Sequence, residues 1–148
     1  MWSLSPSQKR QYEKDLFHIL THLRHNEIHM SIASYNTRAS HYLESMNVRH
    51  FFDHVIGSQN VMDKYVMITE ILNRYKEDGI ILEPSHLLFF DDDIVNIERV
   101  RGQKITSVCV GKKTGVTMKL IEGYITFSKV NRPVQKTLEI CVRNRQPS

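Results

Sequence analysis

The stretch 86–93 reads HLLFFDDD, an apolar run that ends in three consecutive carboxylates. An unbroken apolar run of this length is typical of a strand buried on both faces, as in a parallel sheet. Ligands of open α/β sheets bind at the carboxyl ends of the strands, so the acidic triplet lies where a binding site is expected. Because burying three adjacent carboxylates without compensation is strongly unfavourable, the triplet predicts a bound cation.

Magnesium is the expected cation, because it is a hard ion that binds one or two carboxylates together with water and phosphate oxygens. Asp91, Asp92 and Asp93 are therefore candidate metal ligands. The alternative is a surface loop in which Asp93 caps a helix that begins at Ile94. A cap accounts for Asp93 alone, whereas the adjacent pair Asp91 and Asp92 favours the metal site.

On both sides of this stretch, short apolar runs alternate with segments in which apolar residues recur at the spacing of a helix. We expect strands at 28–33, 54–57, 86–90 and 105–110, and helices at 5–26, 38–46, 63–78 and 94–101. The alternation predicts an α/β fold with a mostly parallel sheet covered by helices on both sides. Beyond Gly111 the spacing predicts an edge strand at 124–130 and a short terminal helix from Pro133 through Leu138 and Val142.

The chain has 148 residues, 41% of them hydrophobic and 24% charged, as is ordinary for one soluble globular domain. We expect a core at 8–111 and a C-terminal extension at 112–148. The composition excludes a disordered chain, a fibrous repeat and a disulfide scaffold. No apolar run is long enough to span a membrane, no signal peptide is recognised, and the two cysteines lack metal-ligand spacing. An intracellular protein is expected, cytoplasmic with the nucleus not excluded.

The net charge of +4 is mildly basic, and basic residues gather near the C-terminus: Arg132, Lys136, Arg143 and Arg145. A basic excess gives weak affinity for polyanions, although it more often serves solubility. Polyanion binding is therefore the third-ranked hypothesis for function. Neither a membrane nor a nucleic acid is an expected partner.

Three weaker patterns favour plain surface structure. Histidines at 18 and 22, and at 25 and 29, have a spacing that can bind a metal from one helix face, but neither pair has an apparent third ligand. The segment 111–115 reads GKKTG and superficially suggests a phosphate loop. It lacks the Walker spacing, so a solvated loop is the preferred interpretation.

Two further sites are expected beside the acidic triplet. Ser34 ends the strand at 28–33. Its hydroxyl and the backbone N–H groups of Tyr35 and Asn36 are suited to bind a phosphate oxygen at a helix N-terminus. Lys64 lies in the first turn of a predicted helix, where the helix dipole disfavours a cation, so an anionic partner is expected nearby. A cap serine and a solvated lysine are the plainer alternatives for each residue taken alone.

The order of these features resembles the haloacid dehalogenase (HAD) superfamily of phosphohydrolases, and most of all its magnesium-dependent phosphatase branch. Ser34 looks like the second motif of that family and Lys64 like the third. The stretch 89–97, FFDDDIVNI, looks like the fourth motif. The resemblance covers about residues 16–110, and the 29 residues between Ser34 and Lys64 are too few for a large inserted cap.

The resemblance implies a HAD-like, Rossmannoid three-layer sandwich without a cap, and magnesium as the cofactor. The implied partner is a phosphorylated small molecule or a phosphoprotein. The implied site residues are Ser34, Tyr35, Asn36 and Lys64 for phosphate, and Asp91, Asp92 and Asp93 for the metal.

One part of the family pattern is absent. The first motif is a buried strand that ends in Asp-x-Asp, whose first aspartate is the nucleophile and whose second is the general acid and base. Residues 1–33 contain a single aspartate, Asp15, and it lies in the helix predicted at 5–26. The leading hypothesis is an inactive or impaired pseudoenzyme that retains a phosphate and magnesium crevice. The alternative is an active magnesium-dependent phosphohydrolase whose nucleophile comes from elsewhere, or a permuted arrangement with Asp91 as the candidate catalytic residue.

The absent motif also removes the strand that the family places at the middle of the sheet. A sheet without that strand exposes unpaired edges, which are prone to aggregation. We therefore expect another segment to fill the gap, with 124–130 as the candidate, or a second copy of the chain to pair there as a homo-oligomer.

Overall fold

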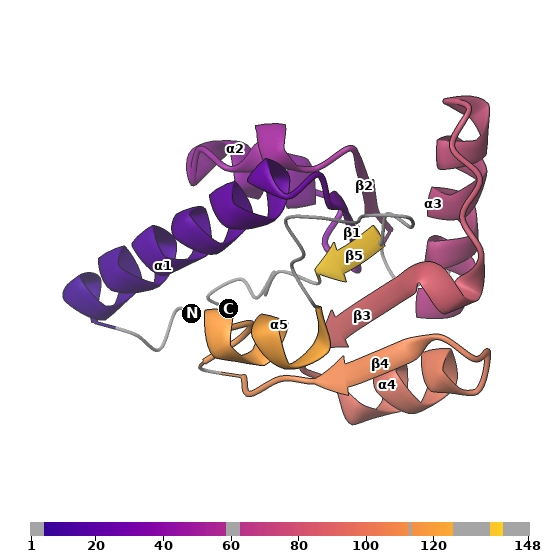
Figure 1. The fold of residues 1–148 in the computed structure, drawn as a ribbon. Helices are drawn as coiled ribbons and strands as arrows, with labels where there is room; N and C mark the ends of the chain where they lie inside the picture. The colour runs from indigo at the N-terminus through magenta and orange to yellow at the C-terminus, as the bar shows by residue number, and fades with distance from the viewer. Residues whose placement is uncertain (1–4, 59–62, 113, 126–136, 141–148) are drawn as a thin grey trace.

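The computed structural model describes residues 5–58, 63–112, 114–125 and 137–140, the last of these by its backbone (Figure 1). Its helices are α1 (Pro6–His25), α2 (Ala39–Ser45), α3 (Lys64–Glu77), α4 (Ile94–Arg101) and α5 (Met118–Tyr124). Its strands are β1 (His29–Ser34), β2 (His54–Gly57), β3 (Leu87–Asp91), β4 (Thr106–Cys109) and β5 (Thr137–Ile140). Two 3-10 turns, η1 (Arg49–Phe51) and η2 (Pro84–His86), precede β2 and β3. None of the helices in these ranges is long and apolar enough to cross a membrane.

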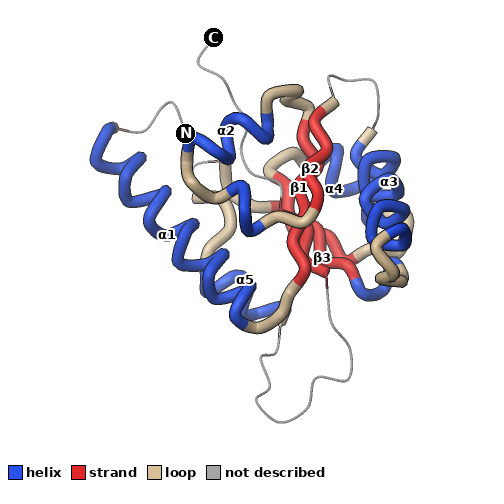
Figure 2. The backbone as a smooth tube through the Cα atoms, turned by 90° about the horizontal axis from the view of Figure 1, so that it is seen from above, coloured by secondary structure: helices blue, strands red, loops and turns tan. Residues whose placement is uncertain are grey.

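The strands form one five-stranded parallel sheet in the order β2-β1-β5-β3-β4. Figure 2 shows the sheet between two layers of helices, with α1, α2 and α5 on one face and α3 and α4 on the other. The α/β class and the parallel sheet that the alternating sequence pattern predicts are therefore confirmed.

The apolar run in β3 supplies side chains to the cores on both faces of the sheet. Leu88 and Phe90 pack in a cluster with residues of α1 and α5. Leu87 and Phe89 pack with residues of α3 and α4 on the opposite face. Successive side chains of a strand point to opposite faces, so a strand covered on both sides is apolar throughout.

The first helix forms because the sequence carries both a start signal and an apolar stripe. The Ser5 hydroxyl oxygen accepts from the Gln8 backbone N–H, and the Gln8 side chain accepts from the Ser5 backbone N–H, which makes a capping box. The buried residues of α1 are Leu16, Ile19, Leu20 and Leu23. Full burial of each such side chain contributes about 1.5–3 kcal/mol, so packing against the sheet holds the helix in place.

Two expectations for the C-terminal part of the chain are wrong. No strand begins at Tyr124, because Tyr124 is the last residue of α5, a helix that Thr117 caps by accepting from the Leu120 N–H. The predicted terminal helix is not formed at Leu138, which lies in β5. Residues 126–130 of the first predicted segment, and residues 133–136 and 141–142 of the second, lie outside the described residues.

The strand β5 fills the gap that the sequence predicts at the middle of the sheet. Leu138 pairs with Met30 of β1 on one side and with Leu88 of β3 on the other. This pairing satisfies backbone N–H and C=O groups that would otherwise be orphaned on two strands, and it outweighs the weak helical spacing of the segment. The gap is thus filled by residues 137–140 of the same chain, rather than by 124–130 or by a second copy.

Candidate functional site

A buried ion pair lies at the carboxyl end of the sheet. Asp91 is the last residue of β3 and Lys64 is the first residue of α3, and each side chain is only 3% exposed. Lys64 Nζ lies 3.5 Å from Asp91 Oδ2 and donates to the backbone carbonyl oxygen of Ala33 at 2.6 Å. Because Ala33 is in β1, the ammonium group connects the ends of the two strands that flank β5. Two residues that the sequence predicts in one crevice therefore lie side by side.

Two N–H donors also hold the Asp91 carboxylate. Oδ1 accepts from the Asp93 backbone N–H at 3.1 Å, and Oδ2 accepts from Asn96 Nδ2 at 3.0 Å. Burial raises the pKa of Asp91 above its ordinary value, while Lys64 and these hydrogen bonds oppose the rise. The carboxylate is therefore ion-paired and hydrogen-bonded, yet it takes up a proton more readily than an exposed aspartate does.

Tyr35 covers the ammonium group and completes the network. Lys64 Nζ lies 4.9 Å from the centroid of the Tyr35 ring, within the range of a cation–π contact. The Tyr35 hydroxyl donates to Asn96 Oδ1 at 3.4 Å, and burial raises the pKa of Tyr35. We call Tyr35, Lys64, Asp91 and Asn96 the Lys64 network. No local pattern predicts the contact between Tyr35 and Asn96, because these residues are far apart in the chain.

The loop after β1 is held by contacts of its own. The buried Ser34 hydroxyl accepts from the Asn36 backbone N–H at 3.0 Å, and Asn36 Oδ1 accepts from the Arg38 N–H at 2.9 Å. The end of β2 packs closely against this loop, because a Cβ on Gly57 would lie only 2.5 Å from the Asn36 carbonyl oxygen. The loop is therefore fixed at the edge of the sheet where Lys64 lies. Phosphate binding by Ser34, Tyr35 and Asn36 stays a prediction.

The acidic triplet does not build a complete magnesium site. Asp93 Oδ1 accepts from the Val95 N–H at 2.9 Å, which makes Asp93 the N-cap of α4. Both Asp91 oxygens already accept hydrogen bonds, and Asp92 is half-buried. Within the described ranges, no three His, Cys, Asp or Glu side chains are grouped so that they could hold a metal, and this includes the histidine pairs 18/22 and 25/29. Magnesium binding at Asp91, Asp92 and Asp93 stays a prediction.

Two substitutions at Asp93 test its role as the N-cap of α4. Asp93→Ala is expected to lower the free energy of unfolding by about 1 kcal/mol, because the first turn of α4 loses its acceptor. Asp93→Asn is expected to change stability by only a few tenths of a kcal/mol, because asparagine caps about as well as aspartate. Urea denaturation measures both values. A loss of about 1 kcal/mol in both variants would show that the charge matters and would reject the capping role.

A second polar cluster lies at the amino end of the sheet, and the sequence did not predict it. Asp53 Oδ2 accepts from the Tyr75 hydroxyl at 2.9 Å and lies 3.0 Å from His29 Nδ1. The Tyr75 hydroxyl also lies 2.7 Å from Ser31 Oγ. Because Ser31 and Tyr75 are fully buried, these hydrogen bonds satisfy polar groups of the core. The cluster ties the start of β1 to α3.

No protein-family model matches this chain, and no curated protein matches it either. The basic residues that motivate the polyanion hypothesis all lie outside the described residues: Arg132, Lys136, Arg143 and Arg145. The proposal for function therefore rests on the sequence motifs and on the geometry of the Lys64 network.

Proposed function

We propose that this chain is a HAD-like protein whose crevice at the carboxyl end of the sheet binds a phosphomonoester without hydrolysing it. The observation that carries the proposal is the buried Lys64 ammonium, fixed between Ala33 and Asp91 at the ends of two parallel strands. Parallel α/β sheets bind their ligands at this edge, and an ammonium group there is suited to a phosphate oxygen. The ligand class is a phosphorylated small molecule or a phosphoprotein.

The strand order supports the family assignment. The resemblance expects the nucleophile-bearing strand at the middle of the sheet, and β5 holds that position. β1, which ends in Ser34, and β3, which ends in Asp91, then lie on either side of it. The second, third and fourth motifs of the resemblance thereby come from β1, α3 and β3 at one edge of the sheet.

The proposed absence of turnover is supported by the lack of an aspartate in β5 and in the residues that follow it. β5 reads TLEI and residues 141–148 read CVRNRQPS, and neither segment contains an aspartate. An aspartyl-phosphate route requires a carboxylate oxygen that can reach the phosphorus atom. Asp91 is unsuited to this role, because both of its oxygens accept hydrogen bonds and one of them faces Lys64.

Asp91→Asn is expected to strengthen phosphate binding. In the wild-type chain the Asp91 carboxylate offsets the Lys64 charge, so the pair as a whole attracts a dianion only weakly. When the carboxylate charge is removed, the positive charge of Lys64 is no longer offset and attracts the phosphate more strongly. We expect the affinity for phenyl phosphate to rise about tenfold. Isothermal titration calorimetry at neutral pH measures the change, with Asp92→Asn as the matched control beside it. Equal or weaker binding by Asp91→Asn would contradict the assigned role of Lys64.

Hydrolysis of 4-nitrophenyl phosphate, with and without magnesium, tests the absence of turnover. We expect no release of 4-nitrophenol above the rate of the buffer. Magnesium-dependent release that is lost in both Asp91→Asn and Asp92→Asn would overturn this part of the proposal and establish an active phosphohydrolase. Failure of both the wild-type chain and Asp91→Asn to bind phenyl phosphate would instead overturn the binding function itself.

A further inference from the structure

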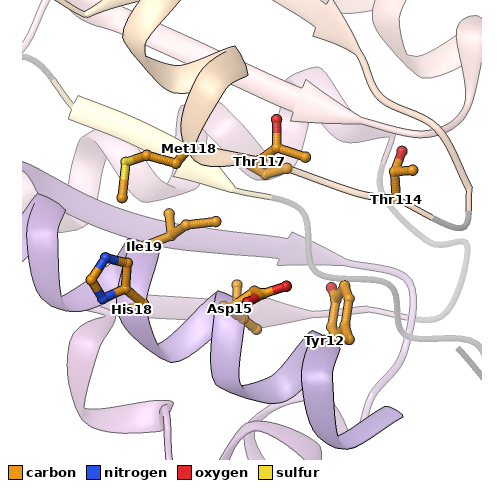
Figure 3. A pocket seen from close by; sticks show the side chains of 9 residues that line it. Tyr12, Asp15, His18, Ile19, Thr114, Thr117 and Met118 are labelled. Carbon is orange, nitrogen blue, oxygen red and sulfur yellow. The ribbon is translucent and has the colours of Figure 1, made fainter. Parts of the chain in front are cut away.

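A separate pocket of about 290 Å³ opens between α1 and the loop that leads into α5. Figure 3 shows its floor, formed by α1, and its roof, formed by the loop and the first residue of α5, Met118. Its volume is at the lower end of the range for small-molecule pockets, roughly 300–1,000 Å³. No residue of the Lys64 network lines it, so this inference does not depend on the proposed function.

The floor of the pocket carries its polar groups. Figure 3 shows the Tyr12 hydroxyl pointing from α1 toward the loop, with the Asp15 carboxylate on the same side of the helix. Asp15 Oδ1 accepts from Gln11 Nε2 at 2.8 Å, which is its one hydrogen bond among the described residues, and the side chain is exposed. Among the residues that the structure describes, Asp15 is the one carboxylate of the lining, and no lysine or arginine lines the pocket. The pocket therefore favours a cation over an anion.

The remaining lining is largely apolar and is held in place. Ile19 on the floor is buried, and Val116 and Met118 on the roof are half-buried. The loop closes on itself, because the Gly115 N–H donates to the Gly111 carbonyl oxygen at 2.8 Å. Gly115 has φ +61°, and a Cβ there would lie 3.5 Å from the Tyr12 ring, so the loop runs directly beside that ring. Among the described residues, the pocket thus combines an apolar wall with one carboxylate.

We propose that this pocket binds a small organic ammonium ion with an apolar body. The ammonium group donates to the Asp15 carboxylate and to the Tyr12 hydroxyl oxygen, and the Tyr12 ring adds a cation–π contact. The apolar body packs against Ile19 and Met118. His18 also lines the pocket.

An NMR titration of the full chain with 2-phenylethylammonium tests the proposal. The titration is run at about pH 8, where an alkyl ammonium keeps its proton. We expect amide shifts centred on residues 12–19 and 114–118, with a dissociation constant in the millimolar range. The uncharged 2-phenylethanol, which has the same ring and chain length, is expected to bind about threefold to fivefold more weakly, as for a partly exposed ion pair.

Two variants of α1 complete the test. Asp15→Asn keeps the size of the side chain but removes its charge, and it is expected to weaken 2-phenylethylammonium binding about threefold to fivefold. Glu13→Gln removes a carboxylate two residues away that does not line the pocket, and it is expected to bind as the wild-type chain does. Equal binding by Asp15→Asn and Glu13→Gln would overturn the proposal. Shifts confined to other parts of the chain, or no shifts in the millimolar range, would also overturn it.

Discussion

Replacing Lys64 by methionine is expected to lower the free energy of unfolding by about 3–5 kcal/mol at neutral pH. Removing one member of a buried ion pair leaves the other charge without compensation, and such losses are typically of this size. Here the charge left behind is the carboxylate of Asp91, whose side chain is 3% exposed. The hydrogen bond from Lys64 to the Ala33 carbonyl oxygen is lost as well. Urea denaturation measures the difference.

The loss in Lys64→Met is expected to depend on pH. Burial raises the pKa of Asp91, so the folded state binds a proton more readily than the unfolded state does. The contribution of Asp91 to the free energy of unfolding therefore falls as the pH rises from about 4 through the raised pKa, and it stays low above that value. Without Lys64 the pKa of Asp91 rises further, because the charge that lowers it is gone. The variant is expected to recover part of its stability as the solution is acidified toward about pH 4.

Two controls show whether the buried pair causes the loss. Lys76→Met changes an exposed lysine of the same helix and is expected to alter stability by less than about 0.5 kcal/mol. The double variant Lys64→Met with Asp91→Asn is expected to be more stable than Lys64→Met alone, because no buried charge is left unpaired. If Lys64→Met were no less stable than Lys76→Met, the ion pair would have no structural role.

Replacing Leu138 by proline is expected to abolish cooperative folding. Leu138 lies in the central strand β5, whose backbone pairs with β1 and β3 on its two sides. Proline has no N–H to donate, and its ring does not fit within a central strand. The break would separate the β2–β1 pair from the β3–β4 pair, and we expect a loss above about 5 kcal/mol, the lower end of typical domain stability.

Circular dichroism during thermal unfolding, together with gel filtration, measures the effect of Leu138→Pro. We expect no cooperative transition and an aggregated chain. Leu138→Val keeps the N–H group and introduces a β-branched apolar side chain, which suits a strand, so it is expected to unfold cooperatively as a soluble protein. A folded monomer of Leu138→Pro would mean that β5 is not a central strand in solution.

The α/β core could be predicted because its signals are local. The apolar run that ends at Asp91 identifies β3, and the start of α1 is marked by Ser5 and its capping box. The sequence also predicted that Lys64 and Asp91 lie close together, because the carboxyl ends of parallel strands share one edge of the sheet. For Asp93 the sequence left two roles open, a metal ligand and a helix cap, and in the structure Asp93 is the N-cap of α4.

The remaining features could not be predicted, because they depend on distant partners. β5 has only four residues, Thr137–Ile140, and becomes a strand because two other strands need partners there. The spacing of Leu138 and Val142 fits a helix, so a local pattern gave the wrong element. The contacts of Tyr35 with Asn96 and of Tyr75 with Asp53 join residues that no periodic pattern relates. Long-range competition for hydrogen bonds therefore decides what the sequence pattern leaves open.

The central position of β5 also sets the order of events while the chain is being made on the ribosome. β5 begins at Thr137 and β1 at His29, so 108 residues (137 minus 29) are added between the starts of two neighbouring strands. At roughly 5–20 residues per second this takes on the order of 5–20 seconds. During that time the β2–β1 pair presents an open edge, and so does the β3–β4 pair once Cys109 has been added. Such edges are the kind of surface that chaperones shield. The contact order of the sheet is high, so folding is expected to be slow and to finish only after β5 has left the exit tunnel.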